Sequence, residues 1–190
     1  SSSNAANSGA TNLFDSTFFV MNSSNAVYKV IENDGATAST VEPTSTSNSI
    51  FETSDGYRWK YMYSLTSAEA LNFMSTDFIH VSTDSTVSAA AVDGALDTIL
   101  VVAGGSSFNT SSGSTISAIP IRGDGSSGVA SVTISSGAIT AATVTTAGSG
   151  YTFAYIRDAD IIAATNAGGA GSGSNLNVII PPKGGHGSNA

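Results

Sequence analysis

Short apolar runs, separated by clusters of small polar residues, recur along this chain and predict strands and turns. Residues 18–21 are apolar, residues 26–31 are apolar apart from Lys29, and the two runs flank the sequence "NSSN". Residues 131–145, "SVTISSGAITAATVT", hold two further apolar runs around Ser136-Gly137. Two apolar runs joined by a short cluster of turn residues are typical of β-hairpins. We therefore expect a hairpin at each of these places and a mostly β chain.

Aromatic residues alternate with other side chains in "DGYRWKYMYSL", which begins at Asp55. After a turn at Asp55-Gly56, this alternation would place four rings on one face of a strand, because successive strand side chains point to opposite faces. Packing in the core is the favoured interpretation. A platform for stacking on sugars or bases would give the same pattern. The four rings are those of Tyr57, Trp59, Tyr61 and Tyr63.

One segment, "TSAEALNFM", has the pattern of a helix and begins at Thr66. Thr66 or Ser67 can cap its amino end, and Glu69 stands near the third helical position, which gives a partial capping box. We predict a short helix near residues 67–74. The following "DFIHV", residues 77–81, is predicted to be a short strand.

The composition changes near residue 84, and the region that follows contains an internal repeat. "TILVVAGGSSF" at 98–108 resembles "ATVTTAGSGYTF" at 142–153. In both copies a β-branched run leads into glycines and then an aromatic residue. Glycine allows φ values that other residues avoid, so we predict tight corners whose aromatic residue fills the core. In the second copy these residues are Gly148, Gly150 and Tyr151.

These patterns predict a mostly β protein with two β-sandwich-like domains, the second inserted in the first. The inserted sandwich spans residues 85–175, and the internal repeat supplies its two halves. The first domain is discontinuous and incomplete, and comprises residues 18–84 and 176–190. Residues 1–17 are expected to be a flexible end.

Composition and charge exclude several classes of partner. The net charge is -8, and only six Lys and Arg residues are spread along the chain. Such a chain cannot neutralise a phosphate backbone, so nucleic-acid binding is not expected. The sequence has no Cys, which excludes disulfides and thiolate metal sites. No window reaches about 18 consecutive apolar residues, so no membrane-spanning helix is expected.

The closing stretch "IIPPKGGHGSNA" places a lysine and a histidine among glycines. It is not a phosphate-binding P-loop, because Lys183 precedes the glycines. Zinc needs three or four ligands, and the only other histidine is His80. No nucleophile motif accompanies His186 as a catalytic base. We therefore interpret the loop as a structural crossover in which His186 donates a hydrogen bond and glycines adopt positive φ. These glycines are Gly184, Gly185 and Gly187.

Two short charged motifs carry weaker signals. "RGDG" at 122–125 contains an integrin-type tripeptide, but Gly-Asp-Gly is also common in turns. "RDAD" at 157–160 places Asp158 and Asp160 two residues apart without the spacing of a calcium loop. We interpret this pair as the solvated face of a strand. The residues alone therefore predict no enzyme activity, cofactor or metal site.

Four stretches, at residues 18–44, 55–81, 148–152 and 179–190, together resemble a known family. In this order and spacing they resemble the baseplate wedge protein of T4-like contractile-tailed phages, in the version found in marine cyanophages. This wedge component forms a dimer. The resemblance covers nearly the whole chain from residue 18, although His80 stands where relatives have proline.

The resemblance implies a structural protein of the phage tail baseplate, assembled in the cytoplasm of the infected host and carried in the virion. Its implied partners are other wedge proteins and a second copy in a homodimer. It implies no catalytic or cofactor residues, and it implies that the closing loop is internal to a longer protein. The alternative is a carbohydrate-binding or adhesin-type β-sandwich module, which would use exposed rings.

Overall fold

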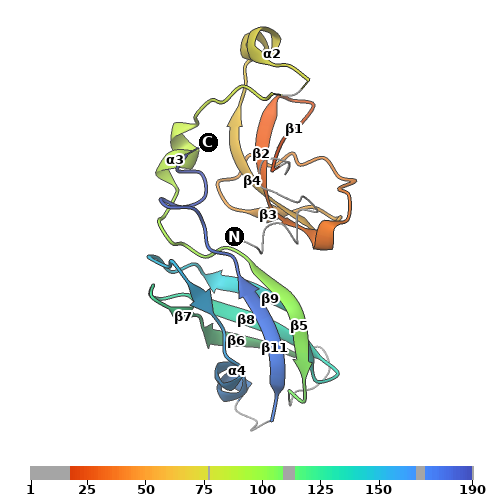
Figure 1. Cartoon of the computed structure of the whole chain (residues 1–190), viewed down its shortest axis with the longest axis vertical. Coiled ribbons are helices and arrows are strands. Elements are labelled where there is room, and N and C mark those ends of the chain that lie inside the picture. The colour runs from red at the N-terminus through yellow and green to blue at the C-terminus, as the bar shows by residue number, and fades with distance from the viewer. Residues whose placement is uncertain (1–17, 77, 109–113, 166–169, 190) are drawn as a thin grey trace. The chain divides into compact units, whose positions relative to one another are not determined.

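The structure is a computed structural model that describes residues 18–76, 78–108, 114–165 and 170–189 (Figure 1). The fold is mostly β, with antiparallel sheets and few helices, as the hydrophobic pattern predicts. The expected flexible end, residues 1–17, lies outside the described residues. The chain divides into two compact units. Unit 1 runs to Ala91 and resumes at His186, and unit 2 is formed by Val92–Gly185.

Unit 1 contains an antiparallel sheet with the strand order β1-β2-β4-β3. Its elements are β1 (Phe19–Met21), β2 (Ala26–Asn33), the 3-10 turn η2 (Asp34–Ala36), β3 (Phe51–Glu52) and β4 (Tyr57–Ser64). The turn between β1 and β2 is closed by Asn22, whose side-chain oxygen accepts hydrogen bonds from two backbone N–H groups. The turn before β4 uses Gly56 at φ 82°. Both predicted turns are confirmed.

The predicted helix is α2 (Ser67–Phe73), and its capping box is confirmed. The Thr66 hydroxyl accepts from the Glu69 N–H at 3.2 Å, and the Glu69 carboxylate accepts from the Thr66 N–H at 2.8 Å. A second short helix, α3 (Ser85–Ala89), was not predicted. It begins where the Asp84 carboxylate accepts two backbone N–H groups of its first turn.

The strand predicted at 77–81 is wrong for its described residues, 78–81, which have no regular structure. Their backbone is held by side chains instead of a neighbouring strand. The His80 N–H donates to the sulfur of Met74, and the Tyr63 hydroxyl donates to the His80 carbonyl at 2.9 Å. These local bonds satisfy polar groups that a ladder would otherwise pair.

In its described residues, unit 2 has sheets with the strand orders β6-β8-β9, β11-β5 and β10-β7. Its elements are β5 (Ile99–Ser106), β6 (Ser114–Pro120), β7 (Arg122–Gly123), β8 (Val129–Ser135), β9 (Ala138–Thr146), β10 (Ala154–Tyr155), α4 (Asp158–Thr165) and β11 (Ser172–Val178). The predicted β8–β9 hairpin is confirmed. It turns at Ser136 and Gly137, with φ 53° and 80°, and two-residue turns of this kind need positive φ at both positions.

One apolar cluster draws buried side chains from two of these sheets and from α4. β5 lies very close to β9, since a Cβ on Gly104 would stand 2.3 Å from the carbonyl oxygen of Ile139. Only glycine permits this approach of two backbones. The buried members include Ile99 (β5), Ile134 (β8), Ile139 (β9), Ile161 (α4) and Leu176 (β11).

The segment that begins at Asp158 is the helix α4, so the interpretation of "RDAD" as a strand face is wrong. The spacing of two between Asp158 and Asp160 suggested a strand. The segment is a helix instead, and its fully buried Ile161 packs in the core. Asp160 is also buried, which a solvated face does not allow.

The boundaries of the units differ from those expected for the domains. β11 pairs with β5, with Val178 opposite Ile99, so residues 176–185 lie in unit 2 and not with the first domain. Unit 1 extends past residue 84 because Val87 of α3 is buried in a unit 1 cluster. Unit 1 is therefore built from two chain segments that flank unit 2 in sequence. Independent folding of either unit stays a prediction.

Candidate functional site

The ring-bearing strand β4 contributes to the core of unit 1. Trp59, Tyr61 and Tyr63 are buried, and Tyr57 is half-buried. Trp59 stacks on Tyr57 with ring centroids 5.3 Å apart, and its indole N–H donates to the Thr53 hydroxyl at 3.1 Å. The expected burial of the rings is thus confirmed for three of the four. These three leave no open aromatic platform.

The expectation that all four rings share one face is wrong. Tyr61 lies opposite Tyr28, whereas Tyr63 lies opposite Val27, because the register shifts between these pairs. The extra residue, Met62, forms a β-bulge, and a bulge changes which face the following side chain joins. Tyr61 therefore packs with Tyr28 and Trp59, and Tyr63 packs with Val27 in a separate cluster.

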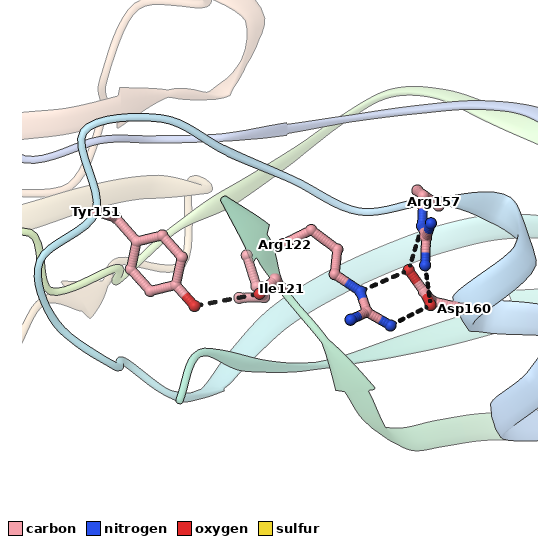
Figure 2. Close-up of polar contacts among 5 residues, drawn as sticks. All are labelled: Ile121, Arg122, Tyr151, Arg157 and Asp160. Atoms are coloured by element: carbon pink, nitrogen blue, oxygen red, sulfur yellow. Dashed lines mark hydrogen bonds and ion pairs between the residues drawn. The ribbon is translucent and has the colours of Figure 1, made fainter. Parts of the chain in front are cut away.

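Tyr151 fills the core of unit 2 beside several glycines, as the repeat predicts. Its hydroxyl donates to the Ile121 carbonyl at 3.1 Å (Figure 2). The same oxygen accepts from the Gly128 N–H at 3.0 Å. A Cβ on Gly125 would stand 2.4 Å from the ring, and one on Gly148 would stand 2.9 Å from it. Gly148 and Gly150 have φ 63° and 73°, which confirms the tight corner.

The other aromatic of the repeat follows the same plan. Phe108 is buried in the same cluster as Tyr151. A Cβ on Gly171 would stand 2.3 Å from its ring, and Gly105 has φ 64°. Both copies of the repeat thus place glycine backbone directly against an aromatic ring.

Sequence reasoning missed an ion-pair network in unit 2, in which the buried Asp160 binds the half-exposed side chains of Arg122 and Arg157. The carboxylate of Asp160 receives hydrogen bonds from Arg157 at 2.9 and 3.0 Å and from Arg122 at 2.8 and 3.2 Å (Figure 2). The bonds from Arg157 and then Arg122 hold the pKa of this carboxyl far below its usual value. Arg157 stands three residues before Asp160, a spacing that signals a helical pair. Nothing in the sequence marks the distant Arg122 as its partner.

Both charged residues of the "RGD" tripeptide are used inside unit 2. Arg122 binds Asp160. Asp124 accepts hydrogen bonds from the Thr152 N–H, the Thr152 hydroxyl and the Phe153 N–H, at 2.8, 2.5 and 3.1 Å. Asp124 of the tripeptide therefore holds the backbone that directly follows Tyr151 in place.

The glycines of the closing loop adopt the positive φ expected of them. Gly184, Gly185 and Gly187 have φ 88°, 91° and 94°. Within unit 2, the Gly184 N–H donates to the Asp93 carboxylate at 2.6 Å. A Cβ on Gly185 would stand 2.3 Å from the carbonyl oxygen of Val92. The loop is thus fastened to the start of unit 2 by backbone that glycine alone can supply.

Replacing Gly185 with alanine is expected to lower the free energy of unfolding of unit 2 by about 1–3 kcal/mol, the usual cost of an unfavourable backbone conformation. The close approach to Val92 adds to this cost. Urea unfolding followed through amide signals of unit 2 would measure it. As a control, Ala at Gly173, where φ is 76° but no atom lies within 4 Å of the added Cβ, isolates the conformational part. Equal effects of the two substitutions would contradict the role of the close approach.

His186 lies in unit 1, and its hydrogen bonding differs from the prediction. Its Nδ1 atom is buried without a hydrogen-bond partner, so the expected donated hydrogen bond is not made by this atom. Gly187 beside it lies against β4, since a Cβ there would stand 3.2 Å from Cε of Lys60. Burial, and then the charges of Lys29 and Lys60, lower the pKa of His186 to about 4. Lys29 and Lys60 stand directly opposite each other in the β2–β4 register.

The stability of unit 1 should therefore fall in mild acid. The pKa of His186 drops from 6.5 to about 4 on folding, so folding favours the neutral ring. Its contribution is complete above pH 6.5 and is lost as the pH falls from 6.5 toward 4. We expect a loss of about 1–3 kcal/mol after allowance for partial exposure. Carboxylates titrate in the same range, so the measurement compares the wild type with His186→Gln at each pH. Parallel curves for the two proteins would contradict the assignment.

A group of large apolar side chains on unit 1 is exposed. These side chains are Leu71, Phe73, Phe78 and Val81, whose exposed fractions are 85%, 61%, 75% and 63%. Helix α2 buries none of its residues. Figure 1 shows α2 at the end of the unit 1 sheet where β4 finishes.

Among the described residues, no three His, Asp or Glu side chains gather in a group that could hold a metal ion. No helix in the described ranges has the length and apolar character needed to cross a membrane. Comparisons with protein-family models, curated proteins and solved structures give no match.

Proposed function

We propose that the chain is a structural component of a contractile phage tail baseplate wedge, which acts by protein–protein assembly and without catalysis. The observation that carries the proposal is the order and spacing of the four stretches at 18–44, 55–81, 148–152 and 179–190. The second stretch forms β4 and α2 and includes all four of these exposed apolar side chains. Exposed apolar side chains beside a buried aromatic strand suit a protein that assembles with others.

The proposal includes a finer account of the fold and the partners. The two units would be β-sandwich-like domains, the second inserted in the first, and the two-segment make-up of unit 1 supports an insertion. The partners would be other wedge proteins and a second copy in a homodimer. The protein would reside in the virion after assembly in the host cytoplasm.

The decisive experiment is mass spectrometry of purified virions of the phage that carries the gene. Peptides from this chain should be present in particles and in isolated baseplates, and the neighbouring genes should encode tail proteins. Absence of the chain from purified particles, with other baseplate proteins detected, would overturn the proposal.

The carbohydrate-binding alternative depended on exposed rings. Burial of Trp59, Tyr61 and Tyr63 removes that support. A glycan array on the purified chain tests the alternative directly. Binding that is lost in a Tyr57→Ala variant would favour it.

A further inference from the structure

Two arginine side chains lie together on the outer side of the two-stranded ribbon formed by β7 and β10. Arg122 of β7 stands directly opposite Tyr155 of β10, so their side chains are cross-strand neighbours. Ala154 and Ile156 pack against the core cluster of unit 2. Alternation therefore places Tyr155 and Arg157, which are two residues apart, on the side away from the core. The side chains of Arg122 and Arg157 are 44% and 52% exposed, and Tyr155 is 47% exposed.

Asp160 holds both guanidinium groups in place and leaves part of each one available. Figure 2 shows the two groups converging on this carboxylate, one from β7 and one from the residue before α4. Arg122 and Arg157 each donate through Nε and Nη2. Within the described part of the chain, neither Nη1 donates a hydrogen bond, so the edge between Nη1 and Nη2 stays open for a second acceptor. Because Asp160 already fixes these planar groups, binding there would cost little side-chain entropy.

The arrangement carries one positive charge in excess. Hydrogen bonds from the two arginines hold the pKa of Asp160 far below its usual value, so this carboxylate is ionised at neutral pH. It balances only one of the two guanidinium charges, and no other carboxylate of the described residues acts on either arginine. Asp158, the nearest acidic residue in sequence, accepts hydrogen bonds from β11 instead. The only other arginine of the chain, Arg58, forms a one-to-one pair with Glu52.

We propose that Arg122, Arg157 and Tyr155 form a docking site for a carboxylate group of a partner protein. The open guanidinium edges supply paired N–H donors that match the two oxygens of a carboxylate, and the Tyr155 hydroxyl is a further donor. A second carboxylate would balance the two guanidinium charges. A protein is favoured over a small acid because the three side chains are exposed, whereas small-ligand sites are concave. Phe153, 55% exposed and two residues before Tyr155, adds apolar area. This inference goes beyond the proposed function and does not depend on it.

The first test titrates the whole chain with three short peptides that differ at one position, which holds glutamate, glutamine or phosphoserine between two leucines. At low salt, the glutamate peptide should shift the side-chain N–H signals of Arg122 and Arg157. It should bind at least about fivefold more tightly than the glutamine peptide and than free acetate. Equal binding of the glutamate and glutamine peptides would overturn the site. Acetate that binds as tightly as the glutamate peptide would overturn the partner protein as its source, and binding of the phosphoserine peptide alone would overturn the carboxylate.

The second test uses variants that keep the network around Asp160. Arg157→Lys retains the charge and a donor for Asp160 but loses the planar fork, so it should weaken binding of the glutamate peptide at least about threefold. Tyr155→Phe, at an exposed side chain, should weaken it at least about twofold through the lost hydrogen bond. The matched control is Arg58→Lys, which changes an arginine of unit 1 and should leave binding unchanged. Amide signals of α4 would show that each variant is folded. Wild-type affinity in both Arg157→Lys and Tyr155→Phe, or an equal loss in the control, would overturn the proposal.

Discussion

Replacing Trp59 with alanine should lower the free energy of unfolding of unit 1 by about 3–5 kcal/mol, the usual cost of truncating a buried large aromatic side chain. Trp59 is 3% exposed. It packs in the cluster of Tyr28 and Tyr61, stacks on Tyr57 and donates a hydrogen bond to Thr53. Alanine would remove all of these contacts and leave a cavity in the apolar cluster that Trp59 fills.

Trp59 is the only tryptophan of the chain, so its fluorescence follows unit 1 in the wild type. The variant lacks this signal, and amide hydrogen exchange of β2 and β4 can replace it in both proteins. Leu71→Ala serves as the control, because Leu71 is 85% exposed and surface substitutions change stability by only about 0.5 kcal/mol. A Trp59→Ala protein with wild-type exchange protection would mean that the ring is not part of the core.

The sequence predicted correctly those turns and helix ends that are fixed by contacts between residues close in sequence. The turns at Asn22, Gly56 and Ser136-Gly137 are fixed by side chains or positive φ within a few residues. The capping box of α2 joins residues three apart. The glycine corner before Tyr151 likewise depends on φ values that glycine adopts at low cost. Each of these features could therefore be inferred without knowing which strands meet.

Long-range pairing could not be predicted in this way. The bulge at Met62 depends on how β2 and β4 fit together, and it moves Tyr63 away from the face of Tyr61. Strand β11 pairs with β5, and its residues Leu176 and Val178 pack in the core of unit 2. The sequence of β11 alone does not indicate which strand it pairs with. Helix α4 was not predicted because the spacing of two between Asp158 and Asp160 was interpreted as a strand, and the sequence does not show that Ile161 packs in the core.

The candidate site residues divide in the same manner. The positive φ of Gly184, Gly185 and Gly187 followed from composition alone. The missing partner of Nδ1 in His186 depends on how His186 and Gly187 pack against β4 within unit 1. The exposure of Leu71 and Phe73 on α2 could not be predicted from the helix signal at residues 67–74. Apolar periodicity indicates that a face is covered, and it does not say whether this chain or another one covers it.

The corner of unit 2 gives the second large expected effect, at Tyr151. Tyr151→Ala should lower the free energy of unfolding of unit 2 by about 3–5 kcal/mol, because the ring is 3% exposed and fills the core. Tyr151→Phe should cost about 1–3 kcal/mol, because the Ile121 carbonyl and the Gly128 N–H each lose a buried partner. Urea unfolding followed by the amide signals of β8 and β9 would measure both. Equal losses for the two variants would mean that the hydroxyl, and not the ring, carries the effect.

A double-mutant cycle then tests whether the glycines are required by the ring itself. A Cβ on Gly125 would stand 2.4 Å from the Tyr151 ring, so Gly125→Ala should destabilise the wild type by about 1–3 kcal/mol, the cost of overpacking a core. In the Tyr151→Ala background the ring is absent and only the Ser149 carbonyl oxygen, 2.6 Å from the added Cβ, still obstructs it, so the same substitution should cost less. The two changes should therefore be non-additive by about 1 kcal/mol or more. Gly150→Ala is the control, because its φ is 73° and no atom lies within 4 Å of the added Cβ. Its cost should be the same in both backgrounds. Additive behaviour of Gly125→Ala with Tyr151→Ala would mean that the glycine serves the backbone turn alone, and that the repeated pairing of glycines with a core aromatic has no energetic basis.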